Sequence, residues 1–123
     1  MKTKKTQTND QTGLLPDGLY AVGEVQVKEI RFVNIPLPTQ YVERRWQLPK
    51  GCKRFTIHCR DGTAVQVAFQ PGQAAGNPPA GTYFTILANT SWWEDNLDIQ
   101  NEDVALYFAC ASNAKVIEIA VGL

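Results

Sequence analysis

His58 is the only histidine in the 123-residue chain, and histidine is the side chain best suited to act as a general base near neutral pH. A nucleophile that it activates must lie within hydrogen-bonding reach, and Cys59 is the nearest candidate along the chain. The alternation from Phe55 to Cys59 predicts a strand, in which neighbouring side chains point to opposite faces. The imidazole and the thiol therefore diverge, and we expect a surface histidine.

Three cysteines, Cys52, Cys59 and Cys110, lie in segments of alternating apolar residues. Cysteine is among the most frequently buried residue types, and an odd number argues against a disulfide framework, so we expect buried thiols. Zinc takes three or four ligands, usually including a closely spaced Cys or His pair, and the sequence has no such spacing. We expect no metal and no cofactor.

Carboxylates gather at Glu94, Asp95 and Asp98. Paired acids can hydrolyse glycosides, and oxygen ligands can hold calcium, but this stretch lacks the glycine and the alternating acids of a calcium loop. A solvated acidic loop is the simpler interpretation. We expect the protein not to be an enzyme.

Aromatic and basic residues indicate binding instead, because tryptophan, tyrosine and arginine are enriched at protein interfaces. If Trp92 and Trp93 lie on an extended segment, one indole can enter the core while the other faces outward. Exposed tryptophan can also stack on sugars, so a carbohydrate-binding module that uses Trp92, Trp93 and Tyr41 is an alternative. A second interface candidate consists of Arg44, Arg45 and Trp46.

Strands are the elements that would position these side chains. Alternating apolar residues predict strands within residues 18–32, 55–60, 65–69, 82–87, 104–110 and 115–121. The Asp61-Gly62 pair predicts a tight primed turn, hence a hairpin of the second and third strands, and residues 112–114 predict a second hairpin between the last two.

Three prolines predict an extended connection over residues 34–50. Residues 88–103 are polar apart from the tryptophan pair, and only residues 92–101 are compatible with a helical turn or two. Many short strands without helical crossovers predict an all-β fold, an antiparallel β-sandwich or a small barrel.

One domain over residues 17–123 is expected, preceded by an extended N-terminal arm over residues 1–16. The arm is polar and contains Lys2, Lys4 and Lys5. It cannot bury enough apolar surface to offset its ordering entropy, so we expect it to be flexible alone and to cross onto a neighbouring chain, where its lysines meet acidic patches.

Twelve basic residues balance twelve acidic ones, so we expect neither nucleic acid nor an anionic membrane as a partner. No apolar stretch approaches the roughly 20 residues that span a bilayer. The N-terminus lacks the apolar segment of a secretory signal, so synthesis in a cytoplasm is expected.

Residues 48–121 contain the following segments in order: LPKG at 48–51, FTI at 55–57, Arg60, VQVAF at 65–69, YFTI at 83–86, ALYFA at 105–109 and AKVIEI at 114–119. This series resembles small β-sandwich virion structural proteins of tailed bacteriophages. The resemblance implies a non-enzymatic virion protein, in the first place a capsid decoration or cement subunit, with a neck or tail-accessory subunit as the alternative. It also implies that the partners are other virion proteins and further copies of this chain in a homo-oligomer, and that no catalytic residue is carried over.

Overall fold

The computed structural model describes residues 26–123, and eight β-strands are its regular elements. No helix occurs among these residues. The strands are β1 (Ile30–Leu37), β2 (Arg44–Gln47), β3 (Arg54–Cys59), β4 (Val65–Ala68), β5 (Phe84–Ile86), β6 (Trp92–Glu94), β7 (Ala105–Ala109) and β8 (Lys115–Gly122). The arm over residues 1–16, with its three lysines, lies outside the described residues.

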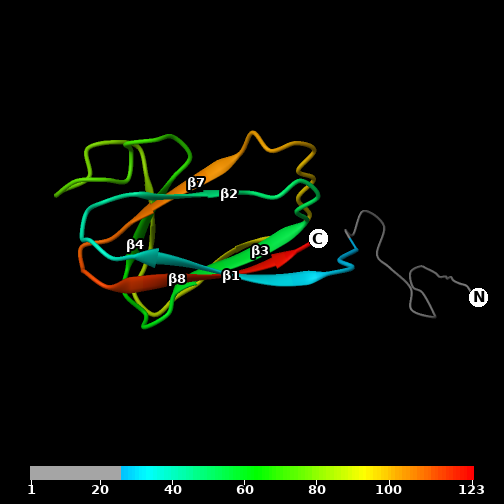
Figure 1. The fold of residues 1–123 in the computed structure, drawn as a ribbon, viewed down its shortest axis with the longest axis horizontal. Coiled ribbons are helices and arrows are strands. Elements are labelled where there is room, and N and C mark those ends of the chain that lie inside the picture. Colours follow the sequence, from blue (N-terminus) through cyan, green and yellow to red (C-terminus); the bar gives the residue numbers. More distant parts are fainter. Residues whose placement is uncertain (1–25) are drawn as a thin grey trace, which may run out of the picture.

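The strands form two antiparallel four-stranded sheets (Figure 1). Sheet A has the order β1-β8-β3-β6, and sheet B has the order β2-β7-β4-β5. Consecutive strands alternate between the sheets, except that β4 and β5 pair within sheet B. Eight strands wound in this order are a jelly roll, one of the antiparallel sandwich architectures. The predicted all-β sandwich is therefore confirmed.

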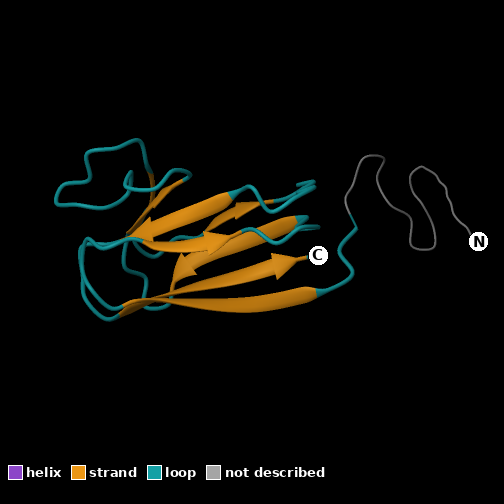
Figure 2. Ribbon diagram, turned by 45° about the horizontal axis from the view of Figure 1, so that its top comes forward, coloured by secondary structure: helices purple, strands orange, loops and turns teal. Residues whose placement is uncertain are grey.

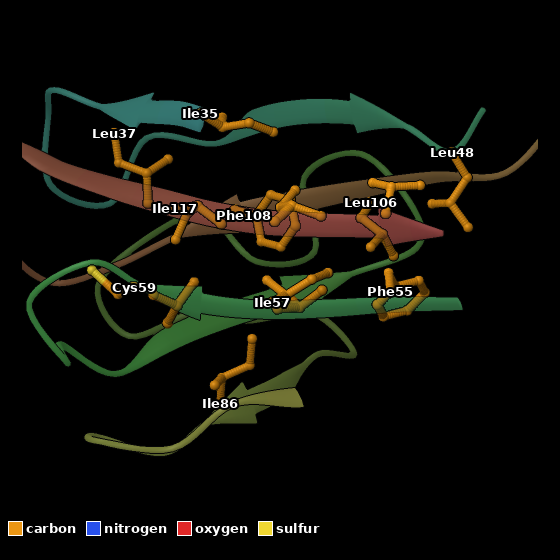
Figure 3. Packing of buried hydrophobic residues seen from close by; sticks show 14 of the residues in the cluster. Ile35, Leu37, Leu48, Phe55, Ile57, Cys59, Ile86, Leu106, Phe108 and Ile117 are labelled. Atoms are coloured by element: carbon orange, nitrogen blue, oxygen red, sulfur yellow. The ribbon is translucent and has the colours of Figure 1, made fainter. Parts of the chain in front are cut away.

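The core lies between the sheets because each strand turns every second side chain inward. Sheet A contributes Ile57, Ile117 and Ile119, and sheet B contributes Val65, Leu106 and Phe108, all of them fully buried. Figure 3 shows Ile57, Ile117, Leu106 and Phe108 in the space between the layers. Since each faces the opposite sheet, the inward set of one sheet requires the other sheet as its cover.

Both hairpins expected from the sequence are wrong. Strand β3 pairs with β8 and β6 in sheet A, whereas β4 pairs with β7 and β5 in sheet B. Residues 60–64, which join β3 to β4, therefore cross between the sheets. Residues 110–114 likewise connect β7 of sheet B to β8 of sheet A. Gly62 has a φ of 83°, but Asp61 does not have the positive φ that a type I′ turn requires. Alternation shows which face a strand buries, and it does not show which strand is its neighbour.

The expected connection over residues 34–50 is also wrong, because it contains the second half of β1 and all of β2. Pro36 is accommodated because β1 is an edge strand that pairs only with β8. Another strand, β6, lies in the polar stretch for which none was expected. This strand is only three residues long, and large side chains lie on both of its faces. The sequence therefore shows little of the alternation between apolar and polar residues that indicates a strand.

Asp61 ties together two of the connections that cross between the sheets, residues 60–64 and residues 110–114. Its carboxylate accepts hydrogen bonds from the backbone N–H of Thr63 at 3.1 Å and from Nζ of Lys115 at 2.5 Å. Lys115 is the first residue of β8, so this pair links the 60–64 connection to the end of the other. The ammonium group, with the Thr63 donors, holds the pKa of the Asp61 carboxyl well below its usual range.

The long loop between β4 and β5 lies at the end of the sandwich away from the C-terminus (Figure 2). The carboxylate of Glu43 accepts hydrogen bonds from the backbone N–H groups of Gly72 and Ala74, each at 2.8 Å. Ala74 is buried against Ala68 and Ala109, whose side chains leave sheet B on its outer side. The outer face of sheet B is thus covered in part.

We predict that Gly62→Val lowers the free energy of unfolding by about 2 kcal/mol or more, because valine is strained at the positive φ of Gly62 and also meets Asn89. A Cβ at this glycine would collide with the side chain of Asn89, whose backbone N–H also donates to the Gly62 carbonyl at 2.9 Å. Gly72→Val is the matched control, because Gly72 has a φ of 81° with no heavy atom within 4 Å of the added Cβ. Urea unfolding measures both; equal losses would show that the Asn89 contact adds nothing.

Candidate functional site

The side of the sandwich formed by the edge strands β5 and β6 carries a group of large apolar side chains. Phe69, Tyr83, Phe84 and Leu87 are four of the eight large hydrophobic residues that are exposed within residues 26–123. Trp92, which is half-buried, lies among them. We call these five residues the aromatic edge.

Ring contacts join the aromatic edge to the core. The ring centroids of Phe84 and Trp92 are 5.5 Å apart, and those of Trp92 and Phe55 are 5.0 Å apart. Phe55 in turn contacts Trp46 edge-to-face at 6.5 Å. Trp92 donates its Nε1–H to Oε2 of Glu94 at 2.9 Å, which fixes the indole plane. The exposed rings therefore have a rigid base.

Two shallow hollows flank the Phe84–Trp92 contact. One, of about 330 Å³, is lined by Phe69, Tyr83 and Glu94 in addition to this pair. The other, of about 230 Å³, is lined by Leu87 and Trp93 on the opposite side. Contiguous exposed apolar surface that is hollowed in this way is typical of a protein interface.

The outer face of sheet A presents a second surface of different character. Its register places Phe32, Ala120, Thr56 and Trp93 side by side in one row across all four strands. Phe32 is 81% exposed and Trp93 is 62% exposed, so two aromatic side chains stand at the two edges of the sheet. Small side chains lie between them, which leaves the middle of the row low.

A polar row runs beside the aromatic one. It consists of Asn34, Glu118 and His58, continued by Ser91 next to β6. Nε2 of His58 lies 2.8 Å from Oε1 of Glu118, and Nε of Arg60 donates to Oε2 of the same carboxylate at 2.7 Å. Phe32, Ala120 and Thr56 of the aromatic row, together with Asn34, Glu118, His58 and Arg60, line a hollow of about 320 Å³, which we call the sheet A trough. Trp93 lies beyond this hollow, at the β6 end of the aromatic row.

The carboxylate of Glu118 is the electrostatic centre of the trough. Arg60 first, and then His58, lower the pKa of its carboxyl by hydrogen bonding to the charged form. Oγ of Ser91 lies 3.4 Å from Nδ1 of His58, which completes a Ser–His–Glu series. The contact between Ser91 and His58 is long for proton transfer. The carboxylate of Glu118, which would stabilise an imidazolium ion, is also paired with Arg60. The series orients polar groups on this face of the sheet.

Comparison of the chain with protein-family models, curated proteins and solved structures finds no match. The geometry described above is therefore the basis for assigning a role. Within residues 26–123, no three His, Cys, Asp or Glu side chains are grouped as metal ligands, and no helix is able to cross a bilayer.

The structure separates the residues that the sequence put forward. The expectation for the tryptophan pair is confirmed, because Trp92 packs on the core while Trp93 faces outward. Trp46 is also packed on the core, whereas Arg44 and Arg45 are exposed on β2 at the far edge of sheet B.

Tyr41 serves partly as an internal tie. In the loop between β1 and β2, its N–H donates to the carbonyl of Cys110 at 2.7 Å, and its carbonyl accepts from Gly76 at 3.1 Å. It does not lie in the row of Phe32 and Trp93. All three cysteines are buried, as expected, and His58 and Cys59 point to opposite faces of β3.

Sequence reasoning missed Phe32, Glu118 and Phe84 as surface features. One signal was available: the apolar pattern of β1 changes phase between Phe32 and Val33, so one of the two sets must face outward. Glu118 carries no such signal, since its partners come from a strand distant in sequence. Phe84 has the inward register of Val67 and is exposed only because β5 lies at an edge.

We predict that the protein loses stability on acidification from about pH 4 downward, the region in which free carboxyl groups titrate. The carboxyl groups of Asp61 and Glu118 have lower pKa values in the folded protein than in the unfolded chain. Each group therefore stabilises the fold fully at a pH above its unfolded-state pKa, and this stabilisation is lost as the pH falls through its folded-state pKa. Asp61→Asn and Glu118→Gln should each reduce this loss. Denaturant unfolding across that range checks the effect, and variants as acid-sensitive as the wild type would contradict it.

Proposed function

We propose that the protein is a non-enzymatic structural subunit of a virion, which binds further copies of itself and other virion proteins through the aromatic edge. The observation that carries this proposal is the exposure of Phe69, Phe84 and Leu87 beside the short edge strands β5 and β6. Burial of apolar surface is worth about 25 cal/mol per Å², so these side chains favour association strongly. Aromatic anchors on a rigid base are also typical of interface hot spots.

The architecture supports the same proposal. Jelly rolls form viral capsid domains as well as lectin domains and cupins, so the fold is compatible with several functions. The resemblance of residues 48–121 to virion proteins of tailed bacteriophages favours the first of these. Capsid decoration or cement is the station we propose, with a neck or tail-accessory position as the alternative, after synthesis in the host cytoplasm.

Further contacts complete the proposed assembly. Arg44 and Arg45 are exposed on β2, at the edge of sheet B opposite β5, and are available to a second neighbour. Residues 1–16 would cross onto an adjacent subunit, with Lys2, Lys4 and Lys5 near acidic side chains. A compact body with such contacts on two sides suits a repeating shell or ring.

We predict that the purified protein self-associates as its concentration rises, and that Phe69→Ser combined with Leu87→Ser keeps it monomeric. The two side chains are 58% and 66% exposed, so their replacement removes apolar surface from the aromatic edge and leaves the core intact. Val42→Ser is the matched control, because Val42 is 51% exposed and lies outside the edge. Sedimentation velocity gives the oligomeric state.

Two results would contradict the proposal. One is a wild-type protein that remains monomeric at every concentration. The other is a double variant that assembles like the wild type and the control.

A further inference from the structure

We propose that the sheet A trough binds a neutral oligosaccharide. The proposal does not depend on assembly through the aromatic edge, because the trough lies on the outer face of sheet A and can be tested in the isolated subunit. It extends the function from building a particle to attaching that particle to a carbohydrate surface.

The aromatic row supplies the stacking surfaces. Phe32 and Trp93 occupy the first and last strands of sheet A, three strand spacings or about 14 Å apart. A pyranose ring has faces of C–H groups, and these pack on flat aromatic rings. Since Ala120 and Thr56 are small, a chain of sugar rings can lie across the sheet between the two aromatic contacts.

The polar row supplies the hydrogen bonds. Sugar hydroxyls both donate and accept hydrogen bonds. The carboxylate of Glu118 can accept from them, and the amide of Asn34 and the hydroxyl of Ser91 can donate as well as accept. Glu118 has each of its oxygens held, one by His58 at 2.8 Å and one by Arg60 at 2.7 Å, so its free lone pairs have fixed directions. Preorganised polar groups beside apolar surface are the usual composition of a small-ligand site, and the volume of about 320 Å³ is sufficient for one.

The charges of the trough favour a neutral ligand. The guanidinium of Arg60 is paired with Glu118, so neither charge is left to attract an ion. An acidic sugar placed over the Glu118 carboxylate would be repelled by it. A hydroxyl-rich ligand can instead add hydrogen bonds to the paired groups without separating them.

The aromatic edge lacks these features. Its hollow beside Tyr83 and Phe84 is mostly apolar, with Glu94 as the one acidic side chain, which is already bonded to Trp92. The trough and the edge therefore suit different partners, a sugar and a protein.

The experiment uses the full chain and an array of neutral oligosaccharides of glucose, galactose, mannose and N-acetylglucosamine, with sialylated and sulfated glycans as comparison. Binding to one or more neutral members is expected, followed by calorimetric titration of the best. Phe32→Ala and Trp93→Ala should each weaken that binding by about tenfold or more, as expected for loss of a central aromatic contact. Glu118→Gln should weaken it as well, through lost charge-assisted hydrogen bonds.

Val42→Ala is the control, because it shortens an exposed apolar side chain outside both the trough and the aromatic edge and should leave the affinity unchanged. Thermal unfolding of Phe32→Ala, whose side chain is almost fully exposed, verifies that a loss of binding is not a loss of fold. The proposal is overturned if no neutral oligosaccharide binds, if only acidic glycans bind, or if Phe32→Ala and Trp93→Ala bind as tightly as the control.

Discussion

The packing of inward side chains between the two sheets is the constraint on which the rest of the structure depends. Leu106 and Phe108 of sheet B and Ile57 of sheet A have no exposed surface, and neither sheet could bury its set alone. Two consequences follow from period-two alternation. Every second side chain must face outward, on the outer face of its sheet. Because the sheets are open, each one also ends in two edge strands that have a neighbour on one side only. The loop held by Glu43 covers part of sheet B, while the outer face of sheet A stays open and becomes the trough.

The two candidate surfaces arise from different parts of this architecture. The aromatic edge forms where both sheets end in three-residue strands, so that Phe84, in the inward register of Val67, reaches the surface. The trough instead depends on register across four strands, which aligns Phe32 with Trp93 and Glu118 with His58. One surface is thus an uncovered extension of the core, and the other is a patterned sheet face. That difference is the basis for proposing a protein partner for the first and a sugar for the second.

The sequence was sufficient for the fold class and for the approximate positions of β3, β4, β7 and β8, since alternation is local. It was insufficient for pairing: the Asp61-Gly62 turn looked like a hairpin, yet the chain there crosses to the other sheet. Prolines concealed β1 and β2, because Pro36 is harmless on an edge strand and that status is a tertiary property. The opposite orientations of Trp92 and Trp93 could be predicted, whereas the neighbours of Trp93 could not, because Thr56, Ala120 and Phe32 lie on distant strands.

Hydroxyl-radical footprinting of the free subunit and of its assembled form shows whether the aromatic edge is the assembly surface, because it reports the solvent exposure of individual aromatic side chains. We expect Tyr83 and Phe84 to be modified readily in the free protein and protected in the assembly, while Phe32 in the trough is modified equally in both. Equal modification of Tyr83 and Phe84 in the two states would contradict the assignment of the aromatic edge as the surface through which the subunit assembles.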